Sequence, residues 1–194
     1  MPSPAASSPF DQSRYQVRLD WGRAGLERLA AADVVVVVDV LSTGSPSAAA
    51  DVAAAAAASG SLVLRGGLRN AAAVADAVLA EQQRRAARTS IAVIAVGDPG
   101  GGDGALRVAV EDLLGAGAVV DALSLRGIDH TAPEAAAACD SFRGLRGAVR
   151  HLLTASGSGQ ELVAADRRDE ALAAAELDAD TVVPVFRDGV FADA

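Results

Sequence analysis

Two adjacent acidic residues, Glu111 and Asp112, interrupt a segment of small and aliphatic residues that reads GALRVAVEDLLGAGAVVDAL over 104–123. If a helix starts near Val110, both carboxylates lie in its first turn. One interpretation is that they stabilise the positive end of this helix, by roughly 0.3 to 1 kcal/mol each. The other is that they bind a hard cation such as Mg²⁺, which prefers oxygen ligands. Spacing alone favours the helix-end role.

A third carboxylate, Asp39, stands near the end of the run DVVVVVDV at 33–40. Ligands of open α/β sheets bind beyond the C-terminal ends of the strands, so Asp39 is a candidate site residue. The alternative is an Asp whose side chain caps the following turn. The glycine-rich segment 97–104 could bring main-chain amides close to an anion. It matches neither the Walker motif nor the dinucleotide motif, and a plain connection is the simpler interpretation.

The elements that must position these groups follow from hydrophobic patterning. Five consecutive valines at 34–38 predict a strand buried on both faces, as in a parallel sheet between helix layers. Further strands are predicted at 13–22, 61–66, 91–97, 159–166 and 181–189, and helices at 23–32, 48–58, 71–87, 110–123, 134–153 and 169–177. Asn70 is expected to cap the helix that follows it. This alternation predicts an α/β fold with a mainly parallel sheet flanked by helices.

Composition limits the classes of partner. The 194-residue chain carries 25 acidic and 17 basic residues, and this net charge of -8 argues against nucleic acid and anionic membranes as partners. The only cysteine, Cys139, fits a reducing compartment, and no secretory signal opens the chain, so we expect a cytoplasmic protein. Residues 1–12 are predicted to form a disordered tail and residues 13–194 a single domain.

Four segments, taken in order, resemble the 2-phosphosulfolactate phosphatase (ComB-type) family. They are YQVRLDWG with DVVVVVDVLS, LRGGLRNAAAVADAV, IAVIAVGDPGGGDGALRVAVEDLLGAGAVVDAL, and LLTASGSGQELVAADRRDEALAAAELDADTVVPVFRDGVF. The specificity of the match comes from their order and spacing. The resemblance places Asp39, Asn70, the Glu111–Asp112 pair and Ser158 on motif positions of the family, and it implies a three-layer α/β architecture.

The activity implied by this resemblance is Mg²⁺-dependent hydrolysis of 2-phosphosulfolactate, or of a related small phosphorylated organic acid, to sulfolactate and phosphate. The resemblance implies that Asp39, Glu111 and Asp112 serve the metal and catalysis, directly or through water. It also implies that Asn70 and Ser158 contact the substrate. The nucleophile is either Asp39 or a water molecule.

Arginines near the predicted strand ends suit an anionic substrate, because a guanidinium binds phosphate or sulfonate through forked hydrogen bonds. The candidates are Arg65, Arg69 and Arg107, and Arg69 beside Asn70 is assigned with it to substrate binding. These arginines would make the site positively charged locally, although the chain as a whole is negatively charged.

The chain departs from the family pattern after Ser42. Family members continue there into a Thr-rich segment and a later Asn-Gly-Thr element, whereas here Thr43-Gly44-Ser45 follows at once. Gly66 or Gly67 also stands where the family tends to have Cys. The alternative function is therefore a catalytically impaired, small-molecule binding protein that lacks part of the active site. With either function we expect a homodimer, because small α/β domains packed with alanine often pair.

Overall fold

The computed structural model describes residues 8–42, 47–98 and 105–193. Within these ranges the strands form one six-stranded sheet in the order β1-β4-β2-β3-β5-β6. The strands are β1 (Val17–Trp21), β2 (Val34–Val38), β3 (Leu62–Gly66), β4 (Ile91–Ala95), β5 (Pro184–Arg187) and β6 (Val190–Asp193). The first four are parallel, and β5 and β6 form an antiparallel hairpin at one edge. The α/β prediction with a mainly parallel sheet is confirmed.

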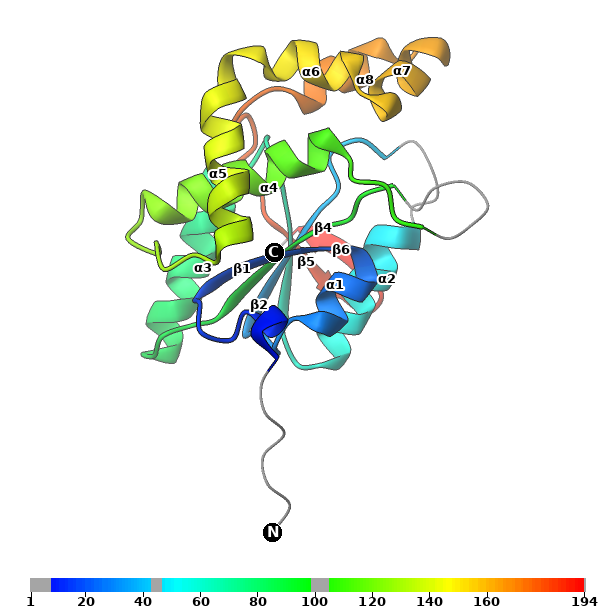
Figure 1. Cartoon of the computed structure of the whole chain (residues 1–194). Coiled ribbons are helices and arrows are strands. Elements are labelled where there is room, and N and C mark those ends of the chain that lie inside the picture. The colour runs from blue at the N-terminus through cyan, green and yellow to red at the C-terminus, as the bar shows by residue number, and fades with distance from the viewer. Residues whose placement is uncertain (1–7, 43–46, 99–104, 194) are drawn as a thin grey trace.

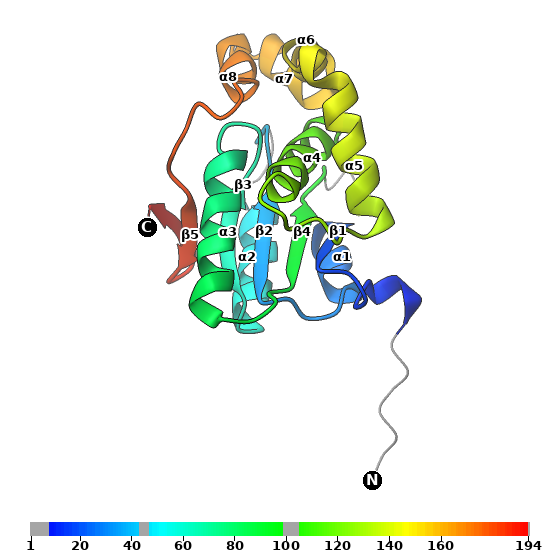
Figure 2. The ribbon, with the colours of Figure 1, turned by 90° about the vertical axis from the view of Figure 1, so that its left-hand side faces the viewer.

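Helices cover both faces of the sheet, and others lie across one end of it. In Figure 1, α1 and α2 lie on one side of the sheet and α3, α4 and α5 on the other. Figure 2 shows α6, α7 and α8 above the edge where the parallel strands end. The helices are α1 (Gly22–Arg28), α2 (Ser47–Ala58), α3 (Ala71–Arg85), α4 (Val110–Ser124), α5 (Pro133–Leu145), α6 (Val149–Ala155), α7 (Gly157–Ala164) and α8 (Arg168–Ala174).

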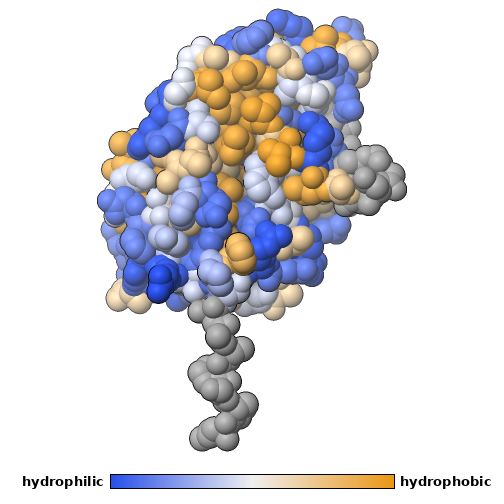
Figure 3. All heavy atoms as spheres, viewed as in Figure 1, coloured by the Kyte–Doolittle hydropathy of each residue, from blue (hydrophilic) through white to orange (hydrophobic). Residues whose placement is uncertain are grey.

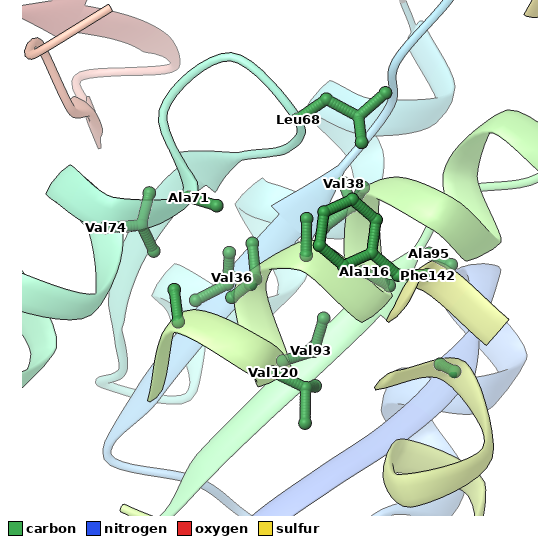
Figure 4. Close-up of a cluster of buried hydrophobic side chains, with 14 of the residues drawn as sticks. Val36, Val38, Leu68, Ala71, Val74, Val93, Ala95, Ala116, Val120 and Phe142 are labelled. Carbon is green, nitrogen blue, oxygen red and sulfur yellow. The ribbon is translucent and has the colours of Figure 1, made fainter. Parts of the chain in front are cut away.

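The valine run of β2 explains why the core has two halves. Val34, Val36 and Val38 belong to the cluster under α3, α4 and α5, whereas Val35 and Val37 belong to the cluster under α1 and α2. Figure 4 shows the first cluster, in which Val36 and Val38 lie near side chains of α3 and α4. Because strand side chains alternate between faces, an unbroken apolar run serves both halves at once. The expectation of a strand buried on both faces is confirmed.

Two local expectations are wrong, and a third holds only in part. Residues 159–166 are not a strand: α7 contains 159–164, and Ser156 caps this helix by accepting a hydrogen bond from the Gly159 N–H (3.1 Å). The closing segment 181–189 contains the expected strand, β5, but Asp188 and Gly189 adopt positive φ and turn the chain into β6, which takes the edge of the sheet instead. Asn70 precedes α3, but its side chain makes no capping hydrogen bond.

The expected tail lies partly outside the described residues. Its last part is ordered: Pro9–Asp11 forms a short 3-10 helix, and the buried Gln12 exchanges hydrogen bonds with the main chain of Leu19 (2.9 and 3.1 Å). These contacts hold residues 8–12 against the start of the sheet.

One face of the molecule carries a concentration of apolar side chains. Figure 3 shows it between α4 and α6, extending toward the segment before α4. In that segment Leu106 is 42% exposed and Val108 57% exposed. The homodimer stays a prediction. Within the described ranges, the helices are too short or too polar to cross a bilayer.

Candidate active site

The end of β2 places Asp39 at the rim of a pocket of about 570 Å³. The Ser42 hydroxyl donates to one Asp39 carboxylate oxygen at 2.9 Å, and the nearest Arg65 nitrogen lies 3.9 Å from the same oxygen. The pocket is lined by the β3–α3 turn, by α8 and by the segment that leads into β5: Asp39, Val40, Arg65, Gly66, Gly67, Leu68, Arg69, Asn70, Ala174, Ala179, Asp180, Thr181, Val182, Pro184 and Asp193. This is the strand edge where ligands of α/β proteins bind.

Asp112 connects the ends of β2 and β4 to the first turn of α4. One carboxylate oxygen accepts the Val40 N–H and the other accepts the Gly97 N–H, each at 2.8 Å. The pKa of Asp112 is raised to about 7, chiefly by burial; the negative charges of Asp39 and Glu111 add to the rise, and the two main-chain hydrogen bonds oppose it. Asp112 thus joins α4 to the main chain that directly follows Asp39, and the charges of Asp39 and Glu111 both act on its carboxylate.

Glu111 is the least satisfied polar side chain of this cluster. It is only 2% exposed, and both of its carboxylate oxygens are buried without a hydrogen-bond partner among the described residues. Glu111 stands one helical turn before Gly115, on the same side of α4. A side chain at Gly115 would meet Val38 and Val40, so this side faces the end of β2. A buried carboxylate without partners is costly unless a proton or a cation satisfies it.

The donor set fits Mg²⁺ in part. Carboxylate oxygens are suitable ligands, and the unsatisfied oxygens of Glu111 would gain a partner from a cation. Asp112, in contrast, already uses both oxygens to accept main-chain N–H groups. Within residues 8–42, 47–98 and 105–193, no three His, Cys, Asp or Glu side chains are arranged as a metal-binding group. Asp39 and Glu111 could therefore offer oxygens to a cation more readily than Asp112, which holds the main chain after β2 and β4.

The side chain of Asn70 is occupied by the main chain of the pocket wall. Its oxygen accepts the Gly67 N–H at 3.0 Å, and its amide nitrogen donates to the carbonyls of Arg65 (3.2 Å) and Val182 (3.1 Å). Asn70 thus joins the β3–α3 turn to the segment before β5. Its role in the structure is to shape the pocket that it lines.

Arg69 also lines the pocket, but acidic side chains occupy its guanidinium. It forms a forked pair with Asp180 at 2.7 and 2.8 Å, a bond to Glu176 at 3.0 Å and a further bond to the carbonyl of Ala173. These hydrogen bonds raise the pKa of Arg69 above its ordinary value. Arg69 therefore holds α8 and the following segment against the pocket.

Four expected site residues lie outside the lining of this pocket: Glu111, Asp112, Ser158 and Arg107. Ser158 is buried in the first turn of α7. Arg107 pairs with Asp98 at 2.9 Å, and its guanidinium lies 3.2 Å from the position that a side chain at Gly157 would take. Arg107 and the start of α7 are thus neighbours. The glycine-rich segment between them and β4 lies largely outside the described residues.

The pocket wall formed by residues 178–182 was not anticipated from the sequence. The main-chain N–H groups of Asp178 and Asp180 donate to the carbonyls of Leu68 and Arg69, at 3.0 and 2.8 Å. The Asp178 carboxylate accepts the Ala72 N–H at 2.8 Å and so supplies the cap of α3 that Asn70 does not. No local pattern signals this, because more than a hundred positions separate the partners.

Comparison with known proteins gives a family. The family model of 2-phosphosulpholactate phosphatase matches residues 47–189, roughly three quarters of the chain. Curated proteins provide no significant match. Asn70, Glu111, Asp112 and Ser158 lie inside the matched range, whereas Asp39 and the first two strands precede it. The chain belongs to the 2-phosphosulpholactate phosphatase family.

Proposed function

We propose that this protein is a Mg²⁺-dependent phosphatase that hydrolyses 2-phosphosulfolactate, or a related small phosphorylated acid, to the hydroxy acid and phosphate. The observation that carries the proposal is the buried Glu111, whose carboxylate oxygens have no hydrogen-bond partner among the described residues. Its neighbour Asp112 accepts the Val40 N–H, directly after Asp39 of the pocket lining. Membership of a phosphatase family supports the reaction class.

In this proposal Asp39 and Glu111 hold Mg²⁺ and Asp112 positions the loops that carry them. Asp112 joins Val40 and Gly97 to α4, so its carboxylate fixes the strand ends relative to the helix. When bound, Mg²⁺ would neutralise charge on the phosphoryl oxygens, which is the main requirement of phosphoryl transfer. Asn70 keeps the pocket wall in place. Ser158, in the first turn of α7, keeps its expected role of contacting the substrate.

The reaction forms a bond between phosphorus and the attacking oxygen and breaks the bond between phosphorus and the substrate's C2 oxygen. The electron pair of the broken bond stays on that oxygen, which takes up a proton and becomes the hydroxyl of the product. The attacking oxygen belongs either to water or to Asp39. In the second case water then hydrolyses the aspartyl phosphate and restores the carboxylate.

Phosphate release from 2-phosphosulfolactate, measured with MgCl₂ and with EDTA, tests this function. We expect turnover only with Mg²⁺, and a loss of at least 100-fold in kcat for Glu111→Gln, which keeps the shape but removes the charge. Glu161→Gln changes an exposed glutamate on α7 and serves as the matched control. Equal turnover in EDTA, or full activity of Glu111→Gln, would contradict the metal role.

The second candidate is a binding protein without turnover. It is favoured by one observation: the family match begins at residue 47, after the junction at Ser42 where the family pattern is interrupted. This candidate predicts that 2-phosphosulfolactate raises the melting temperature while no phosphate appears even with Mg²⁺. Thermal-shift and phosphate-release measurements on the same sample distinguish the two functions.

A further inference from the structure

The pocket beside Asp39 contains two arginines whose situations differ. Arg69 is held by Asp180, Glu176 and the carbonyl of Ala173, so its donors already have acceptors. Arg65 makes only long contacts to Asp39, at 3.5 Å to the carbonyl and 3.9 Å to the carboxylate, and its side chain is 42% exposed. These are weak interactions for a guanidinium, which has five N–H donors.

The charges in the pocket also distinguish Arg65 from Arg69. The forked ion pair with Arg69 neutralises Asp180, and Asp193 is exposed at the end of β6. Of the described residues that line the pocket, Arg65 is the cation whose donors are left largely for a ligand. It extends from the end of β3, next to the turn that the Asn70 side chain fixes, so its origin is rigid.

We infer that Arg65 is a specificity-determining residue that binds an acid group of the substrate other than its phosphate. The inference rests on the proposed function, which places the phosphate at Asp39 and Glu111. A carboxylate or sulfonate two or three bonds from the phosphorylated carbon would then face the guanidinium beside Asp39. In this inference Arg69, whose guanidinium is bound by Asp180 and Glu176, holds the pocket wall.

The kinetic test compares a substrate that has a second acid group with one that lacks it. Arg65→Met is expected to lower kcat/KM for 2-phosphosulfolactate by about 10- to 100-fold, the loss typical of one charge-assisted pair. It should change kcat/KM for p-nitrophenyl phosphate by less than threefold. Arg65→Lys should recover part of the loss, because lysine keeps the charge but not the fork. Arg187→Met, an exposed arginine on β5 outside the pocket lining, is the matched control.

An equal loss with both substrates would assign Arg65 to the phosphate and overturn the inference, as would no loss with either. A binding measurement separates this failure from a failure of the proposed function. Calorimetric titration with 3-sulfolactate, which has no phosphate, should show binding to the wild-type protein and at least tenfold weaker binding to Arg65→Met. If sulfolactate binding depends on Arg65 but the wild-type protein releases no phosphate, the proposed phosphatase activity is contradicted and the acid-group site is kept. If the wild-type protein turns over 2-phosphosulfolactate but Arg65→Met binds sulfolactate as tightly as the wild type, the phosphatase is kept and the acid-group site is removed.

Discussion

At the scale of single residues, Glu111 is expected to lower the stability of the protein when no cation is bound. Its two buried oxygens have no partner in the described part of the chain, so the protein bears the cost of burying them. Without Mg²⁺, Glu111→Met should raise the free energy of unfolding by about 1 to 3 kcal/mol, because an apolar side chain of similar size removes the unsatisfied group. Urea denaturation in EDTA measures this change. The exposed control Glu161→Met should stay within about 0.5 kcal/mol, and a destabilised Glu111→Met would show that the carboxylate has a structural partner.

Asp112 predicts a pH dependence of stability. Its pKa is about 7 in the folded protein against an ordinary value of 3.8, so the folded state binds the proton more tightly than the unfolded state. The resulting stabilisation is fully present below about pH 4 and is lost as the pH rises through 7, with a slope of at most about 1.4 kcal/mol per pH unit.

Urea denaturation of the Mg²⁺-free protein between pH 5 and 8 measures this slope. Asp112→Asn should remove Asp112's part of it and should lower stability at pH 5, because Val40 or Gly97 loses its oxygen acceptor. The exposed Asp169→Asn on α8 is the control. An unchanged slope in Asp112→Asn would assign the titration to another group.

At the scale of elements, buried strands could be predicted from the sequence better than short amphipathic segments. The valine run of β2 has one interpretation, because only a strand covered on both faces accepts it. Residues 159–166 carry a short apolar run that fits a strand and a helix equally well. The Ser156 side chain, which caps the first turn, favours the helix. The Asp188–Gly189 pair was a readable signal for a hairpin turn, since such turns need positive φ.

The contact between α4 and α5 depends on a glycine. A side chain at Gly117 would collide with the carbonyl of Ala138 and approach Phe142, so Gly117→Ala must push the two helices apart. We expect a loss of about 2 to 4 kcal/mol in urea denaturation, within the range for overpacked or displaced core contacts. Gly144→Ala on α5 has open space around the new methyl group and should instead stabilise by about 0.5 to 1 kcal/mol. Equal stability of the two variants would contradict this packing.

At the scale of the whole molecule, the positions of the three acidic residues in the fold could be predicted, and the pocket wall could not. Asp39, Glu111 and Asp112 follow from where strands end and a helix begins, which local patterns reveal. The wall at 178–182 is placed by long-range hydrogen bonds to the β3–α3 turn and by the ion pairs of Arg69. Those partners become neighbours only after the sheet has brought β3 beside β5.

Because Asp39 and Glu111 come from separate elements, Mg²⁺ should stabilise the fold as a whole. A ligand that binds only the folded state adds RT ln(1 + [L]/Kd), about 2.7 kcal/mol at a hundredfold excess over Kd. For a domain of this size, that corresponds to a rise of roughly 5 to 10 °C in melting temperature. Thermal melts with 10 mM MgCl₂, against NaCl of equal ionic strength, measure it. Glu111→Gln should lose most of the rise, since it removes a proposed ligand while leaving Asp112 to hold Val40 and Gly97. An undiminished rise in Glu111→Gln would place the cation elsewhere, and no rise in the wild-type protein would remove Mg²⁺ from this edge of the sheet.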